Sequence, residues 1–197
     1  MPSLSPGLAA SPTPRPRTPL VPHDSDEDRP APRFHLELHG AGPVGRAIVR
    51  LLADVDCTVR WIDERSDSAE LSLPATDGLP AHIQHLPTDH AVAEVAGAPP
   101  GACHLVLTHR HALDLPIVQA ILARGDFAFL GMLGSPAKRA RFVEQIGAQL
   151  GEAGASDADV QAALQRLVCP IGLPGIVGKA PAVIAIAAVA QLLQGRR

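Results

Sequence analysis

The chain has 197 residues, of which 46% are hydrophobic, and its 17 basic and 20 acidic side chains give a net charge of -3. This length and composition suit one globular domain, and the near balance of charge excludes a global field that would attract nucleic acid or an anionic membrane. The three cysteines are scattered and form no CxxC pair, which excludes a disulfide framework and favours a reducing, cytoplasmic location.

The N-terminal segment, residues 1–33, differs in composition from the rest of the chain. It combines dense proline with an acidic DSDED stretch and has no apolar periodicity. Such a segment cannot bury enough apolar surface to offset the entropy that it loses on ordering. We predict a disordered, proline-rich tail over residues 1–33 and a single domain over residues 34–197.

From Phe34 onward, short apolar runs alternate with segments of helical periodicity. The runs predict strands over residues 34–39, 57–63, 82–86, 103–108 and 127–133. Helices are predicted over residues 43–55, from Pro136, over 156–167 and over 181–194. This alternation indicates an α/β fold, a Rossmann-like doubly wound parallel sheet with helices on both faces.

The final predicted helix, residues 181–194, is apolar on nearly every face. A helix with this pattern is either buried in its own domain or part of a subunit contact, such as a homodimer interface. Its apolar run falls short of the roughly 18 to 20 residues that a membrane span requires. The sequence leaves burial and subunit contact open.

A glycine-rich loop, GAGPVG, follows the first predicted strand in the GxGxxG frame. In this frame the glycines permit a tight turn, close approach of the backbone to a pyrophosphate and close helix packing. Asp63 ends the next strand about 20 residues downstream, where a carboxylate can accept hydrogen bonds from ribose hydroxyls. Arg65 either pairs with a 2′-phosphate or is an exposed loop arginine. The predicted nucleotide-binding residues are Gly40, Ala41, Gly42, Pro43, Val44, Gly45, Asp63 and Arg65.

A second candidate loop, THRHALD, follows the fourth predicted strand at residues 108–114. Ligands of doubly wound sheets lie outside the carboxyl ends of the strands, so we predict ligand contacts from Thr108 and His109. His111 and Asp114 fall in the first turn of the next helix, where His111 is expected to be solvated and Asp114 to favour the helix dipole. A metal site is disfavoured because the chain has no HExxH or similar frame.

A third loop, GSPAKRARF, follows the fifth predicted strand at residues 134–142. Ser135 at the cap and Pro136 at the first helical position predict a helix start. Basic side chains in the early turns make this start receptive to an anion. We predict that Gly134, Ser135 and Lys138 contact the ligand, with a solvated basic face as the alternative.

The last candidate loop, CPIGLPGIVGKAP, is stiffened by proline and precedes the final helix. Cys169 is either a sulfur carrier or a small buried residue, and burial is favoured. Lys179 either reaches a phosphate or is solvated. The sequence assigns neither residue to the site.

Five motifs resemble, in sequence and order, the Rossmann-type C-terminal domain of the xanthine dehydrogenase accessory (XdhC/CoxI) family: HGAGPVGRAIVRLLA, VRWIDER, THRHALDLPI, FAFLGMLGSPAKRARF and CPIGLPGIVGKAPAVIAIAAVAQLL. The resemblance covers the chain from Phe34 onward. It implies an accessory protein or chaperone that binds the molybdenum cofactor, as molybdopterin or its dinucleotide. Such a protein assists sulfuration of the cofactor and its insertion into xanthine dehydrogenase or a related molybdenum hydroxylase, as a carrier rather than a turnover enzyme.

The same resemblance implies further partners. They are a cysteine desulfurase and a separately encoded protein with the N-terminal domain that family members usually carry. Pro43, Arg110 and Val183 depart from the family pattern, which often has a histidine, an acid and a glutamate at these positions.

Two alternative functions remain open. A small NAD(P)-dependent oxidoreductase would use His109 as a proton donor, but one Trp, four Phe and no Tyr leave few aromatic residues to enclose a hydride-transfer site. A nucleotide-sensing interaction domain would express its output through partner binding.

Overall fold

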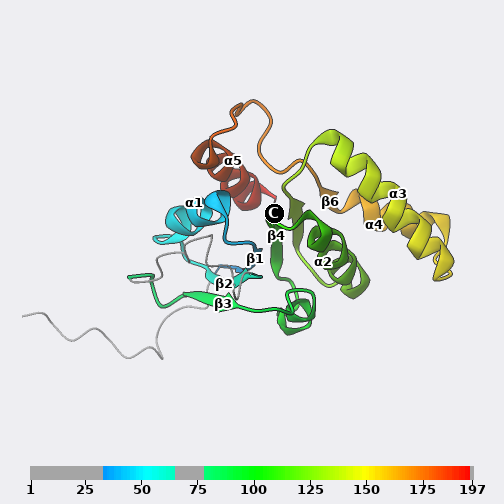
Figure 1. The fold of residues 1–197 in the computed structure, drawn as a ribbon, viewed down its shortest axis with the longest axis horizontal. Helices are drawn as coiled ribbons and strands as arrows, with labels where there is room; N and C mark the ends of the chain where they lie inside the picture. Colours follow the sequence, from blue (N-terminus) through cyan, green and yellow to red (C-terminus); the bar gives the residue numbers. More distant parts are fainter. Residues whose placement is uncertain (1–32, 65–77, 196–197) are drawn as a thin grey trace, which may run out of the picture. The chain divides into compact units, whose positions relative to one another are not determined.

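A computed structural model describes residues 33–64 and 78–195. The predicted tail, up to residue 32, and the predicted site residue Arg65 lie outside these ranges. The described residues form one parallel sheet in the order β3-β2-β1-β4-β5-β6, the strand order of a doubly wound dinucleotide-binding fold (Figure 1). Its strands are β1 (His35–His39), β2 (Thr58–Asp63), β3 (Ile83–Pro87), β4 (Cys103–Val106), β5 (Phe129–Met132) and β6 (Leu167–Val168).

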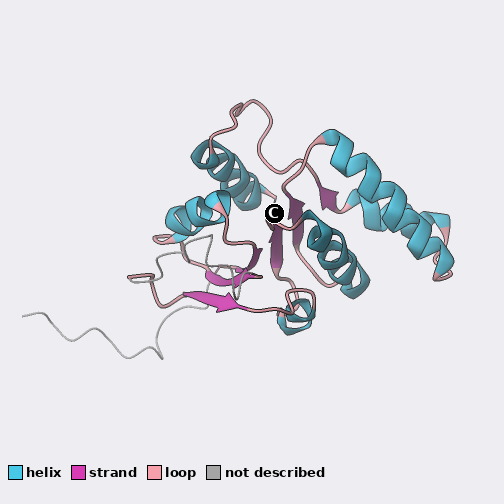
Figure 2. Ribbon diagram, in the orientation of Figure 1, coloured by secondary structure: helices cyan, strands magenta, loops and turns pink. Residues whose placement is uncertain are grey.

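Helices cover both faces of the sheet, as predicted (Figure 2). One face packs against α1 (Pro43–Leu52) and α5 (Pro181–Gln194). The opposite face packs against α2 (His111–Arg124), α3 (Pro136–Glu152), α4 (Asp157–Gln165) and the 3-10 helix η2 (Ala93–Gly97). Each face therefore has its own hydrophobic core, and the α/β Rossmann-like class is confirmed. None of the described helices is long and apolar enough to cross a membrane.

Most element bounds agree with the sequence prediction to within a residue or two. The cap of α4 is confirmed, since Ser156 Oγ accepts the backbone N–H of Asp159 at 3.2 Å. β4 ends at Val106, two residues earlier than predicted, because the chain turns into the next loop after Leu107 donates to His39 O. β6 was not predicted, because two residues are too few to show any periodicity.

The predicted last helix, α5, is partly buried against α1. Its alanine-rich side enters the core through Ala185, Ala188 and Leu192. Ile186 and Leu193 remain exposed on the other side. Burial therefore accounts for one side of the helix, while the homodimer contact stays a prediction.

β1 alternates apolar and polar residues, a pattern typical of a strand with one face in water. Here both faces are covered, and Glu37 and His39 are fully buried. Glu37 accepts two hydrogen bonds of 3.1 Å from Arg60 Nη1, and Arg60 Nη2 donates to Glu94 Oε2 at 2.6 Å. This ion-pair network offsets the cost of burying the carboxylate and fastens η2 to the sheet.

Two buried histidines lie beside this network. His39 and His104 stack with ring centroids 5.8 Å apart. Burial, and then the charge of His104, lower the pKa of His39 to about 3, and burial lowers the pKa of His104 to about 4. Both imidazoles are therefore neutral in the folded protein near pH 6, whereas they take up protons in the unfolded chain below pH ~6.5.

We expect the free energy of unfolding to decrease as the pH falls from about 6.5 towards about 4, because the unfolded chain then binds more protons than the folded protein. His39→Leu should reduce the slope by about 1.4 kcal/mol per pH unit, the linkage of one proton. Urea denaturation across this pH range measures both slopes. The exposed His90 provides the control, His90→Gln, and an unchanged slope in His39→Leu would contradict the prediction.

Candidate functional site

The predicted ligand loops meet at one edge of the sheet, at the carboxyl ends of the parallel strands. The glycine loop follows β1, residues 107–110 follow β4, and residues 133–135 follow β5. β1 and β4 are neighbours in the sheet, yet they lead to α1 and α2, which pack on opposite faces. This edge is a topological switch point, the place where open α/β sheets bind ligands.

The three glycines of the loop differ in what surrounds them. Gly40 has φ +118°, and a Cβ there would lie closer than 3.0 Å to the carbonyl oxygen of Leu107. A Cβ at Gly45 would meet the carbonyl oxygen of Gly40 equally closely. Nothing lies within 4 Å of a Cβ at Gly42, the N-cap of α1, which makes no side-chain capping bond. Gly40 and Gly45 therefore serve packing, while Gly42 leaves open space at a helix start that suits an anion.

The residues between the glycines lie at different depths. Ala41 is buried, Val44 is half-buried, and Pro43 is exposed at the first position of α1. Of these three residues, only Pro43 is exposed next to Gly42.

Two acidic residues follow one another at the end of β2. Asp63 is fully buried, and its Oδ2 lies 3.5 Å from His85 Nε2. A ribose contact from Asp63 would require this carboxylate to leave its buried position. Glu64 is also buried, and its Oε1 lies 2.7 Å from His109 Nδ1 and accepts the backbone N–H of His109 at 3.3 Å. Glu64 was not predicted as a site residue, because its only indication in the sequence is that an acid follows the end of the strand.

The contact with Glu64 orients the predicted ligand residue His109. A carboxylate can only accept a hydrogen bond, so it fixes the proton of the neutral imidazole on Nδ1. Nε2 is then an acceptor, on a side chain that is 40% exposed. The arrangement can accept a hydrogen bond or a proton from a bound molecule at the switch point.

A buried polar chain joins the ends of β4 and β5. Thr108 Oγ1 donates to Asp114 Oδ1 at 2.6 Å, and Asp114 Oδ2 pairs with Lys138 Nζ. Lys138 Nζ also donates to the carbonyl oxygen of Leu133 at 3.3 Å. Asp114 lies in the first turn of α2, as predicted. Its carboxylate is only 1% exposed, and it forms this ion pair in addition to its place at the helix start. The hydroxyl of Thr108 and the charge of Lys138 are thus already engaged.

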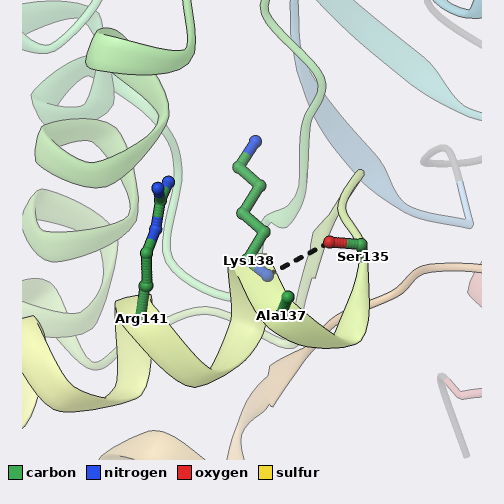
Figure 3. A pocket seen from close by; sticks show the side chains of 4 residues that line it. All are labelled: Ser135, Ala137, Lys138 and Arg141. Carbon is green, nitrogen blue, oxygen red and sulfur yellow. Dashed lines mark hydrogen bonds between the residues drawn. The ribbon is translucent and has the colours of Figure 1, made fainter.

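The start of α3 forms a shallow pocket of about 230 Å³. Ser135 caps the helix, since its Oγ accepts the backbone N–H of Lys138 at 3.1 Å, which confirms the predicted helix start. Lys138 and Arg141 extend from the same side of α3 above Ala137 (Figure 3). Arg141 is the more exposed of the two cations, so it is the better placed to meet an anion in this pocket.

Cys169 is buried beside Gly134, as favoured from the sequence. A Cβ at Gly134 would lie 2.9 Å from Cys169 Sγ, so only glycine fits there without a shift. Burial raises the pKa of the thiol, against the opposing charges of Lys138 and Arg139. The thiol is therefore protonated at neutral pH and is packed as a small apolar group.

Within residues 33–64 and 78–195, no group of three or more His, Cys, Asp or Glu side chains is placed to hold a metal ion. At this edge of the sheet the described residues provide an anion-receptive helix start at Gly42, the His109–Glu64 pair and the buried polar chain from Thr108 to Lys138.

Comparison with known proteins places this fold in a family. The model of the XdhC Rossmann domain matches residues 36–192. A crystal structure of a xanthine dehydrogenase from Bacillus halodurans is similar, with 24% sequence identity and a TM-score of 0.59 over 83% of this chain and 43% of that chain. That likeness shows the fold alone, and this chain spans less than half of that protein. No curated protein matches the chain. Because the family match runs from β1 into α5, this protein belongs to the XdhC Rossmann-domain family.

Proposed function

We propose that this protein is an accessory protein in the maturation of molybdenum hydroxylases. It binds the molybdenum cofactor, as molybdopterin or its dinucleotide, and assists sulfuration and insertion of this cargo. The client is an apoenzyme such as xanthine dehydrogenase. Membership of the XdhC family supports this role.

The observation that carries the proposal is the open space at Gly42. The first N–H groups of α1 have no side-chain cap, and apart from the chain neighbours of Gly42 no described residue lies within 4 Å of a Cβ there. Pterin cofactors carry phosphate, and backbone N–H groups at a helix start bind such an anion. When bound, the cargo carries the metal chemistry of the client enzyme, and this chain holds and orients it. The residues present fit the phosphate end of that cargo.

The loop that follows β4 supplies polar contacts of a different kind. His109 presents Nε2 to the ligand, held in place by Glu64. Thr108, Asp114 and Lys138 brace the wall behind it. In these roles the residues bind and position a molecule, and none of them has to take part in a chemical reaction.

The buried position of Asp63 speaks against an oxidoreductase that uses NAD. In this fold an acid at the end of β2 binds the ribose hydroxyls of NAD, whereas an arginine accommodates the 2′-phosphate of NADP. Asp63 instead lies beside His85 with no exposed surface. Glu64, the neighbouring acid, is engaged by His109. A cargo that is held mainly through its phosphate does not require an acid at this position.

Two further proteins complete the proposed pathway. A cysteine desulfurase supplies the sulfur, and a protein with the family's N-terminal domain acts together with this chain. The buried Cys169 leaves the sulfur to be delivered by such a partner.

The proposal is tested by titrating the protein anaerobically with molybdopterin, its cytidine dinucleotide, NAD and NADP in parallel. We expect a pterin ligand to raise the free energy of unfolding, by about 2.7 kcal/mol at a hundredfold excess over Kd. Gly42→Arg should abolish this increase, because its side chain fills the open helix start. Gly151→Arg is the matched control, since Gly151 lies in α3 and also has nothing within 4 Å of its Cβ.

Each other outcome contradicts the proposal in a defined way. Stabilisation by NAD or NADP without stabilisation by a pterin would favour the oxidoreductase. Unchanged pterin binding by Gly42→Arg would place the cargo away from the glycine loop. Client binding that persists in Gly42→Arg without any ligand effect would favour an interaction domain.

A further inference from the structure

A cleft of about 580 Å³ lies between α1 and the start of α5, next to the glycine loop. Pro43, Arg46, Ala47 and Arg50 line it from α1, and Ala180, Pro181 and Ala182 line it from the other side. The volume falls in the range of about 300–1,000 Å³ that is usual for small-molecule sites. None of the motifs considered in the sequence analysis pointed to these two arginines as a pair.

The cleft carries two positive charges without a matching carboxylate. Arg46 and Arg50 are one helical turn apart and so share a face of α1. Among the described residues, neither guanidinium makes an ion pair or side-chain hydrogen bond, and no acid lines the cleft. Like charges at this spacing destabilise a helix, and Arg46 near the start of α1 also opposes the helix dipole. A bound anion would relieve both costs.

Both helices that border the cleft begin in the same way. Pro43 and Pro181 occupy the first helical positions of α1 and α5. Neither N-cap, Gly42 or Ala180, makes a side-chain capping bond. The positive ends of two helix dipoles therefore add to the two arginines at the same cleft.

The remaining lining is apolar and small. In the described part of the chain, proline and alanine side chains make up the rest of the wall, and none of its members is aromatic or acidic. Such a wall accommodates a planar ring, and a guanidinium can both stack on a ring face and bind phosphate oxygens in a bidentate manner. The chemistry suits a ligand that combines a flat heterocycle with a phosphate.

We propose that the cleft between α1 and α5 is a second ligand site, which binds a nucleoside phosphate through Arg46 and Arg50. The phosphate pairs with the two guanidinium groups, and the base lies against Pro43, Ala47 and Pro181. This site adjoins the glycine loop, with which it shares Pro43, and is distinguished from it by Arg46 and Arg50.

Isothermal titration calorimetry with AMP, CMP, their nucleosides and inorganic phosphate tests the site. We expect both nucleotides to bind, and both nucleosides to bind at least tenfold more weakly. Arg46→Gln and Arg50→Gln should each weaken nucleotide binding about tenfold or more, since each removes a charge-assisted hydrogen bond. Arg139→Gln, in α3 and outside the lining of both pockets, is the control and should leave binding unchanged.

Several results would overturn the inference. If inorganic phosphate bound as tightly as the nucleotides, the base would have no role in binding. If the nucleosides bound as tightly as the nucleotides, the phosphate would have none. Absence of nucleotide binding, or unchanged binding in Arg46→Gln and Arg50→Gln, would exclude the cleft. Because no pterin is used, these results are independent of molybdopterin binding.

Discussion

Gly45→Ala is expected to destabilise the protein far more than Gly42→Ala, although both glycines belong to one motif. A Cβ at Gly45 would meet the backbone carbonyl oxygen of Gly40, which cannot rotate away as a side chain can. Overpacking of this kind costs about 1–3 kcal/mol or more. Gly42 has φ -68° and open space around it, so alanine there should cost about 1 kcal/mol or less, mainly through a poorer N-cap.

Urea denaturation of the two variants measures this difference directly. A large shift in midpoint for Gly45→Ala, at an unchanged slope, would locate the effect in folded-state packing. Equal small shifts would show that α1 can move away from β1, and the packing role assigned to Gly45 would be wrong.

Asp114→Leu is expected to destabilise the protein by about 3–5 kcal/mol, the usual cost of breaking a buried ion pair from one side. The side chain of Lys138 is only 12% exposed, so its ammonium would lose its carboxylate partner in a largely buried position. The double variant Asp114→Leu/Lys138→Met should recover much of the loss, because two apolar side chains then replace the pair.

The exposed pair of Arg124 and Asp126 provides the control. Asp126 is 40% exposed, so Asp126→Ala should change the free energy of unfolding far less than Asp114→Leu does. Thermal and urea unfolding compare the four proteins. If the double variant were no more stable than Asp114→Leu, the loss would come from packing or from the bond to Thr108 rather than from an unpaired ammonium.

The fold was predictable because its determinants are local. The glycine frame, the alternating strand and helix periods and the caps at Ser135 and Ser156 each occupy a few consecutive residues, and all agree with the structure. The preference of parallel crossovers for one hand restricts the topologies, but the strand order itself comes from the structure. The same reasoning predicts the ligand edge, since that prediction depends only on where the strands end.

The parts of the site that could not be predicted from the sequence depend on contacts between residues that are far apart in the chain. Lys138 was predicted as a ligand contact, but its ammonium meets Asp114, 24 positions away. Glu64 and His109 are 45 positions apart, so no local pattern could pair them. The burial of Glu37 could not be predicted for the same reason, because its partner Arg60 lies on the neighbouring strand. Local patterns identify elements and loops, while side-chain partners are chosen by the packed fold.

The hydrogen bond between Glu64 and His109 has a consequence for how a ligand enters. Glu64 follows β2 and His109 follows β4, and these are the two strands that flank β1 in the sheet. The contact therefore bridges the strand from which the glycine loop emerges. If a ligand binds at that loop as proposed, its binding is expected to affect two βα units together, because the Glu64–His109 contact joins the ends of β2 and β4.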